Sequence, residues 1–431
     1  MVKRIQFVIG AVVVAAAMWI WIQDITIAHQ QKQASENDIP RGNLSDLYPR
    51  WLGARELLLR GRDPYGEDIT REIQAGYYGR PLDASRPNDP KDQQAFAYPL
   101  YVVFVLAPTV GLPFAVVQRA FLALLVAVTA GSVLLWLRAL RWRVSAASKV
   151  ACIILVLGCF PAIQGLKLQQ LTLLVAALLA ASMAAIVKRQ FTLAGALLAI
   201  ASIKPQLVFL TALWLLVWIS GNWRERQRLF WSGAASILVL LLGSECLLPG
   251  WIHKFQQATS AYYQYTGGGR FMLDVALSPL GGRLASAVLV VILMVFLWRS
   301  RHDAETSASF QWSLAAVLAT NLVLIPIFAP YNQVLLVPGV LLASKEVRRL
   351  WKANRLSRML VALTAISIAW PWLAAVALAV AWLFVPAATV QRAWALPMGT
   401  TLMIPVSLLA LTFAARSTLL SAGDTPQQHH R

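Results

Sequence analysis

The sequence predicts an all-α, polytopic integral membrane protein, and three observations support that fold class. Hydrophobic residues make up 58% of the 431 residues and charged residues only 13%, which excludes a soluble globular enzyme and a disordered chain. Apolar runs recur along nearly the whole chain, so we expect one multispanning membrane domain over residues 1–431. The 38 Lys and Arg outnumber the 19 Asp and Glu, but their excess lies in short links between apolar runs. This pattern indicates membrane topology, with the lipid bilayer as partner and no nucleic acid.

The N-terminal segment is expected to be the first membrane span. A short basic head with Lys3 and Arg4 precedes about 18 apolar residues, 5–22, which end in Trp19 and Trp21. A secretory signal has a shorter apolar core and a small-residue cleavage site, so we expect an uncleaved span with an interfacial Trp belt. The positive-inside rule places the N-terminus in the cytoplasm.

Residues 28–95 form the only long polar stretch and are expected to be the first extracytoplasmic loop. They contain 11 of the 19 acidic residues and ten Lys and Arg. The later apolar runs are separated by cationic links, which we place in the cytoplasm. The links hold Arg138, Arg141, Arg143 and Lys149; Lys188 and Arg189; Arg224, Arg226 and Arg228; Arg299 and Arg301; and six cations from Lys345 to Arg358.

Alternation of these links gives about 12 crossings and a cytoplasmic C-terminus. Residues 96–112 are apolar but broken by Pro99 and Pro108, so we interpret them as an outer-face or re-entrant element. The C-terminal part, 344–431, has little polar character and is expected to form scaffold spans, near 359–385 and 395–415, followed by a tail.

Two apolar segments, Phe191–Ile203 and Val334–Ala343, are too short to cross a bilayer unaided, since a span needs about 20 residues. Each meets a polar, proline-containing joint on the predicted outer side, at 204–206 and 330–333, and a third polar joint lies at 164–170. Charge and non-helical backbone at membrane depth persist only where they line a cavity. We therefore expect the core spans of residues 96–343 to line a polar cavity that opens outward, roofed by the loops 28–95 and 249–283.

The first outer loop contains an expected amphipathic helix that begins near Asp46 and ends at Gly61, with Pro64 just beyond. Asp46 and Asp63 each have a structural interpretation as an alternative to a functional one. Asp46 has the position of an N-cap, and Asp63 has the position of a turn former.

The order of these motifs resembles glycosyltransferase family 87, a group of mannosyltransferases in the GT-C superfamily. The resemblance covers roughly residues 40–340, and two positions depart from the family pattern: Gln169 stands where a glycine is usual, and Leu100 where a second proline is usual. The matching motifs are Asp46, Tyr48 and Gly61; Asp63-Pro64-Tyr65; Phe96-Ala97-Tyr98-Pro99 and Pro108; Gln170-Leu171-Thr172; Leu193-Ala194-Gly195; Ile203-Lys204-Pro205; and Pro330-Tyr331-Asn332.

The resemblance implies an inverting transferase that moves a hexose, with mannose as the family's sugar, from a polyprenyl-phosphate-sugar donor to a glycolipid or glycan hydroxyl. It implies the outer face of a bacterial cytoplasmic membrane as the location and Asp46 as the general base. Physical chemistry agrees, because one in-line displacement needs one base for the hydroxyl and a cationic site for the departing phosphate. No cofactor and no metal are expected.

Lys204 is the outstanding candidate for the donor phosphate, because apolar residues flank it at a break between two short segments. Its structural alternative is snorkelling to the outer interface. Arg270, which follows three glycines, and Lys167 are further candidates, and Arg119 is a weaker one. The expected substrate contacts are Tyr48, Asp63, Tyr65, Tyr98, Gln170, Gln206, Tyr331 and Asn332.

The sequence lacks the glycine-rich and catalytic signatures of nucleotide-binding domains and soluble hydrolases, and Cys152, Cys159 and Cys246 have no metal-ligand spacing. A lipid-phosphate donor fits that absence, because such a donor is delivered within the bilayer. Two rival classes remain. A secondary transporter also has many spans with broken helices and embedded charge, and a non-catalytic envelope polysaccharide assembly protein is the other.

Overall fold

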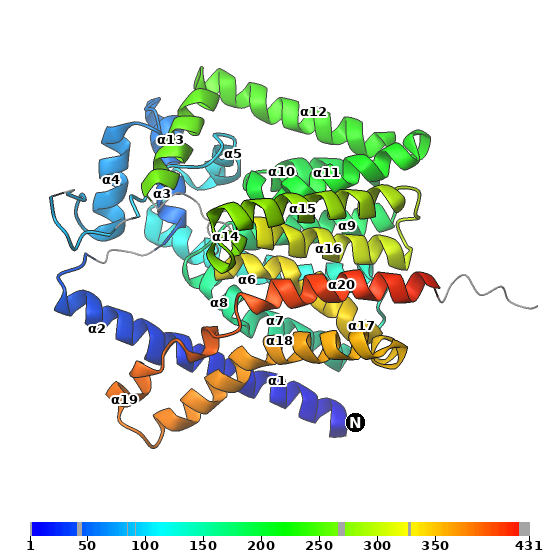
Figure 1. Cartoon of the computed structure of the whole chain (residues 1–431). Coiled ribbons are helices and arrows are strands. Elements are labelled where there is room, and N and C mark those ends of the chain that lie inside the picture. The colour runs from blue at the N-terminus through cyan, green and yellow to red at the C-terminus, as the bar shows by residue number, and fades with distance from the viewer. Residues whose placement is uncertain are drawn as a thin grey trace, which may run out of the picture.

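The computed structural model describes residues 2–40, 45–83, 85–90, 92–265, 272–325 and 329–421, and within these ranges every regular element is a helix. The predicted all-α class is confirmed. The long helices run side by side along one direction in a single bundle (Figure 1). Helices suit a bilayer because they satisfy their own backbone hydrogen bonds.

Six segments of the described chain are long and apolar enough to cross a membrane. They are Arg4–Glu36, which contains most of α1 (Val2–Ile20) and all of α2 (Ala28–Glu36); α6 (Phe114–Ala139); α12 (Trp223–Leu247); α15 (Pro279–Arg299); α18 (Arg355–Trp382); and Ala387–Ala415, which contains α19 (Ala387–Arg392), η4 (Leu396–Met398) and most of α20 (Met403–Ser421). A seventh is possible if α7 (Ala146–Gly158) and α8 (Phe160–Lys167), bent by 59°, form one broken span. The count of about 12 crossings stays a prediction.

Four shorter apolar helices complete the bundle: α9 (Thr172–Val187), α10 (Phe191–Ala201), α11 (Pro205–Gly221) and α16 (Ala308–Leu324). The remaining elements are α3 (Leu47–Arg60), α4 (Glu67–Tyr78), α5 (Val102–Leu106), η2 (Ala107–Thr109), α13 (Trp251–Tyr265), α14 (Met272–Ala276), η3 (Pro330–Leu336) and α17 (Val337–Ala353). The expected short segment Val334–Ala343 is longer than predicted, because α17 continues as a helix into the cationic run.

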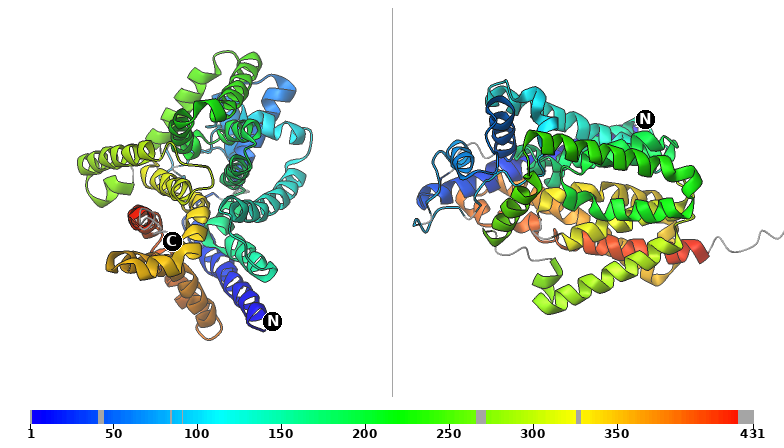
Figure 2. Two further views of the ribbon diagram at one scale, coloured as in Figure 1. Left: turned by 90° about the vertical axis from the view of Figure 1, so that its right-hand side faces the viewer. Right: turned by 90° about the horizontal axis from the view of Figure 1, so that it is seen from above.

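The edge of the bundle is apolar, as lipid contact requires. In the most apolar 18-residue stretches of α12 and α15, only 11% and 17% of the residues are buried. Both helices lie at the periphery when the bundle is viewed end on (Figure 2). Val239 and Leu280 are 69% and 71% exposed, so lipid tails are the natural neighbours of these faces.

The first helix extends further than the sequence predicts. α1 continues through a π-helical stretch, η1 (Trp21–Ile27), directly into α2. Trp21 is fully buried there: its ring packs edge-on against Phe160 at 5.1 Å, and its Nε1 donates to the carbonyl of Trp394 at 2.8 Å. The polar stretch that begins at residue 28 therefore starts as a helix.

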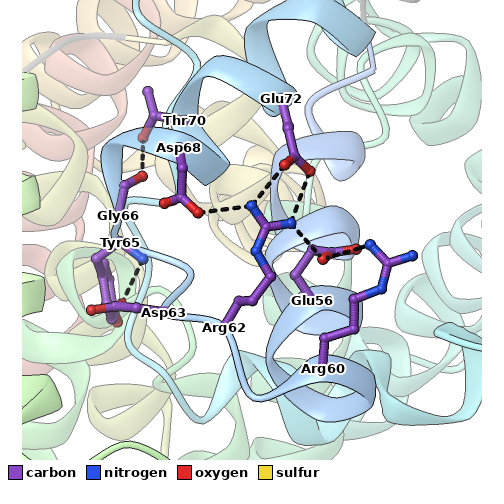
Figure 3. Close-up of polar contacts among 9 residues, drawn as sticks. All are labelled: Glu56, Arg60, Arg62, Asp63, Tyr65, Gly66, Asp68, Thr70 and Glu72. Atoms are coloured by element: carbon purple, nitrogen blue, oxygen red, sulfur yellow. Dashed lines mark hydrogen bonds and ion pairs between the residues drawn. The ribbon is translucent and has the colours of Figure 1, made fainter.

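The predicted helix from Asp46 to Gly61 is confirmed as α3, and Gly61 ends it in the left-handed region at φ 65°. Arg62 fastens the end of α3 to α4 (Figure 3). Its guanidinium donates to the buried carboxylate of Glu56 at 2.8 Å and, on α4, to Asp68 and Glu72 at 2.7 Å each. This network fixes α3, the helix that follows Asp46.

The two ends of the bundle differ in what they carry. The N-terminal end of α1 and the C-terminal end of α20 lie at one end, whereas α4, α13 and α19 lie at the other (Figure 1). We predict that the end with the termini is cytoplasmic.

This topology is testable by labelling single cysteines in a background with its three native cysteines replaced. An impermeant maleimide added to intact cells should label Glu67→Cys, whose side chain is 94% exposed at the α4 end. It should reach Asn222→Cys and Trp351→Cys only after permeabilisation, because both lie in cationic segments placed in the cytoplasm. Labelling of position 222 or 351 in intact cells contradicts the assignment.

Candidate functional site

A cavity of about 270 Å³, the polar cavity, is lined by the start of α3, by the segment before α5, by α13 and by three breaks between helices. The described polar side chains in its wall include Asp46, Arg50, Asp92, Tyr98, Gln170, Lys204, Gln206, Tyr262, Tyr263, Tyr331 and Asn332. The three polar joints singled out in the sequence therefore meet at one cavity, and its wall also includes residues of both loops.

Asp46 precedes α3 but does not cap it, since its side chain makes no hydrogen bond to the first turn. Asp46 thus occupies the N-cap position that its structural alternative stated, without making the capping hydrogen bond. One carboxylate oxygen accepts from the Tyr77 hydroxyl at 3.1 Å, and the other accepts from the side-chain amide of Gln170. Both partners are neutral donors, so the carboxylate is held by hydrogen bonds and not by an ion pair.

Lys204 lies at the break between α10 and α11 and is 5% exposed. Its ammonium donates to Gln170 Oε1 at 2.6 Å and to Thr172 Oγ1 at 2.8 Å, and the Thr172 hydroxyl donates to Asn332 Oδ1 at 3.0 Å. These inward contacts contradict the snorkelling alternative for Lys204. One amide thus separates the carboxylate of Asp46 from the ammonium of Lys204.

Gln169, which stands where the family resemblance leads us to expect a glycine, has a backbone conformation that suits glycine. Its φ is 53°, in the left-handed region that favours glycine. Its side chain forms a clamp in return: its carbonyl oxygen accepts from Ser45 Oγ, and its amide donates to the carbonyl of Gln118 at 2.5 Å. With the bond from the Asp46 amide to the Leu168 carbonyl at 2.9 Å, this clamp holds the α8–α9 joint against the start of α3.

Aromatic rings surround the two cations of the cavity. The Arg50 guanidinium lies over the Tyr98 ring, 4.4 Å from its centroid. The Lys204 ammonium lies 5.7 Å from the Tyr98 centroid and 5.2 Å from that of Tyr331. Tyr65 positions this arrangement, because its hydroxyl donates to the Tyr98 carbonyl at 2.7 Å.

Asp92 is a second carboxylate in the cavity wall, and sequence reasoning did not single it out. It accepts from the backbone amide of Gln94 at 3.1 Å and from that residue's side chain at 2.9 Å. Burial is the main influence on its pKa, which is raised above the usual value for an aspartate. Asp92 therefore holds its proton to higher pH than a free side chain does.

Some expected site residues lie away from the polar cavity. Tyr48 packs edge-on against Phe114, with ring centroids 4.8 Å apart. Asp63 is a turn former, as its structural alternative stated: one oxygen accepts from the Tyr65 amide at 2.9 Å, and the other pairs with Lys254 of α13 at 2.7 Å.

Among the cationic candidates, Lys167 points to the first helix, where it donates to Gln23 and lies 5.3 Å from the Trp19 centroid. Arg119 donates to the Ala115 carbonyl of its own helix at 3.2 Å. Arg270 lies outside the described residues. The structure brings Asp46, Tyr98, Gln170, Lys204, Gln206, Tyr331 and Asn332 together in one cavity wall.

The fold and the polar cavity define a membrane-embedded helical protein with a charged site where its helices break. The sequence model of glycosyltransferase family 87 matches residues 96–326, more than half of the chain, and the chain belongs to that family. The resemblance found in the motifs is thereby confirmed, and the protein is a membrane glycosyltransferase. No curated protein and no solved structure matches the chain.

The Gln169 clamp leads to a prediction about stability. Gln169→Ala keeps a side chain in the left-handed region but loses both hydrogen bonds, so we expect a loss of about 1–3 kcal/mol. Gln169→Gly also loses the bonds but regains about 1 kcal/mol, because glycine adopts this φ without strain. Thermal unfolding midpoints in detergent should therefore rank wild type, then glycine, then alanine. An alanine variant that is more stable than the glycine variant contradicts this account.

Proposed function

We propose that the protein is a GT-C-type hexosyltransferase that moves a sugar, with mannose as the family's substrate, from a polyprenyl-phosphate donor to a hydroxyl of a glycolipid or glycan. The proposed site is the polar cavity, facing the extracytoplasmic side of a bacterial inner membrane. The observation behind the proposal is the pairing of Asp46 and Lys204 at the two ends of the Gln170 amide.

In the proposed reaction, Asp46 accepts the proton of the acceptor hydroxyl as its oxygen attacks the anomeric carbon. The bond between that carbon and the phosphate oxygen breaks, and the electron pair leaves with the lipid phosphate. Lys204 stabilises the charge that gathers on the departing oxygen, in a setting far less hydrated than bulk water. A single displacement of this kind inverts the anomeric centre, and it needs one base and no covalent intermediate.

The neutral donors around Asp46 support its role as base. Gln170 and Tyr77 each donate to a different oxygen of the Asp46 carboxylate. They fix the orientation of the carboxylate and leave it further lone pairs that can accept a proton. A direct ion pair with Lys204 would occupy a carboxylate oxygen, and the Gln170 amide between the two groups takes the place of that contact.

A second cavity supports a lipid-linked donor. This apolar cavity, of about 220 Å³, is walled almost entirely by hydrophobic side chains, among them Met18, Phe160 and Trp372. η3 lies between the two cavities: Tyr331 and Asn332 line the polar cavity, and Gln333 and Leu336 line the apolar one. A prenyl chain in the apolar cavity would place its phosphate near the polar one.

The donor class is tested with purified protein in lipid nanodiscs. Incubated with radiolabelled polyprenyl-phosphate hexose and a membrane lipid acceptor fraction, it should transfer the label, and with nucleotide-linked hexose it should not. A transporter or an assembly protein consumes neither donor. Transfer from the nucleotide sugar alone refutes the proposed donor.

The choice of base is tested by matched substitutions of the two cavity carboxylates. Asp46→Asn should lower turnover about 100- to 10,000-fold, because an amide cannot accept the proton. Asp92→Asn should have a much smaller effect, because the Asp92 carboxylate is already engaged by the backbone amide and the side-chain amide of Gln94. Turnover is measured on folded protein, checked by gel filtration. The reverse ranking would assign the base to Asp92.

A further inference from the structure

We propose that Arg50 and Lys204 together form an anion site on the Tyr98 ring, and that its ligand is the phosphate of the lipid donor. This inference rests on the proposed function and deepens it. It assigns the second cationic contact with the donor phosphate to Arg50, a residue that none of the sequence motifs includes.

Arg50 is placed in the polar cavity by the first turn of α3, four residues after Asp46. One guanidinium nitrogen, Nη1, donates to the Asp46 carbonyl at 2.5 Å, and the group lies over the Tyr98 ring. Its Nε is buried and has no hydrogen-bond partner within the described chain. A buried donor without a partner is costly, and a ligand that accepts from it would remove that cost.

Lys204 approaches the same ring. Its ammonium donates to the neutral oxygens of Gln170 and Thr172. Among the described residues, neither Lys204 nor Arg50 has a carboxylate oxygen within 4.0 Å. Two cations within 6 Å of one ring centroid repel each other in a poorly hydrated cavity, and an anion between them reverses that repulsion.

Arg226 shows what a purely structural arginine in this protein looks like. It too stacks on an aromatic ring, 3.7 Å from the Trp218 centroid. Its guanidinium, however, donates to the backbone carbonyls of Trp218, Arg301 and Asp303 at 2.6–2.8 Å. Arg50 has one such carbonyl and an open face toward the cavity.

A phosphate fits this pair better than a carboxylate does. A guanidinium offers a fork of donors and an ammonium a point charge, and a tetrahedral phosphate has enough oxygens to accept from both. Because Asp46 immediately precedes α3 and Arg50 lies in its first turn, the same helix would set the distance between the proposed base and the departing phosphate.

The test measures binding of polyprenyl phosphate, which carries no sugar, to the full-length protein in nanodiscs. Arg50→Gln should weaken binding about 10- to 100-fold, the loss expected for a charged hydrogen-bonding contact. Arg50→Lys should lose less, since it keeps the charge but not the fork. Arg55→Gln is the matched control: Arg55 lies on the same helix, stacks on Trp51 at 5.3 Å and donates to the Leu112 carbonyl, but is absent from the cavity wall.

Wild-type affinity in a folded Arg50→Gln variant overturns the site, as does an equal loss in Arg55→Gln. Inorganic phosphate that binds as tightly as polyprenyl phosphate overturns the lipid assignment. Should Arg50→Gln fail to fold, wild-type affinity and KM in Arg50→Lys overturn the role of the guanidinium fork. Failure of the two proposals is distinguishable: Arg50-dependent binding without sugar transfer refutes the transferase reaction, whereas transfer unaffected by Arg50→Gln refutes the anion site.

Discussion

The site depends on one side chain, the amide of Gln170, which lies between opposite charges. Its nitrogen donates to Asp46 and its oxygen accepts from Lys204, and the reverse orientation would set donor against donor. Were carboxylate and ammonium in direct contact, each would largely satisfy the other and neither would be free for a substrate. The amide keeps both charges in place and apart, which is the preorganisation that the proposed reaction requires.

Much of the surrounding structure fixes that amide. Gln170 follows a residue in the left-handed region, and the bonds of Gln169 to Ser45 and Gln118 hold the joint in register with α3. At the other end of α3, the ion pairs of Arg62 fasten the helix to α4, which carries Tyr77. Strain at one residue and a charged network at the loop surface therefore support the same few atoms in the cavity.

The sequence was most informative where local chemistry decides the structure. Gly61 ends α3 because only glycine adopts that φ cheaply, and Lys204 stood out because a charge beside a proline interrupts an apolar run.

Asp92 could not be found in this way, since it lies in irregular backbone and reaches the cavity only through the tertiary fold. Lys167 was expected in the site but lies outside it. It is only three residues from Gln170 in the sequence, yet it donates to Gln23, and the chain turns at Gln169 between the two residues. The sequence contains one indication of the role of Arg50. It follows Asp46 by four residues, so the expected helix places both side chains on one face.

Charged groups are treated differently at the periphery and in the cavity. At the periphery, Arg62, Arg80 and Lys254 pair directly with carboxylates. The pairs of Arg62 and Lys254 join a loop to a helix, and the pair of Arg80 with Asp89 closes the loop after α4. In the cavity, Asp46 and Lys204 contact neutral groups, and Arg50 contacts a carbonyl and a ring. Direct pairing would stabilise the empty cavity and compete with a charged ligand. A cavity that holds its cations apart from its carboxylates has an uneven internal field, and that field favours an anion at the cations and a proton donor at the carboxylate.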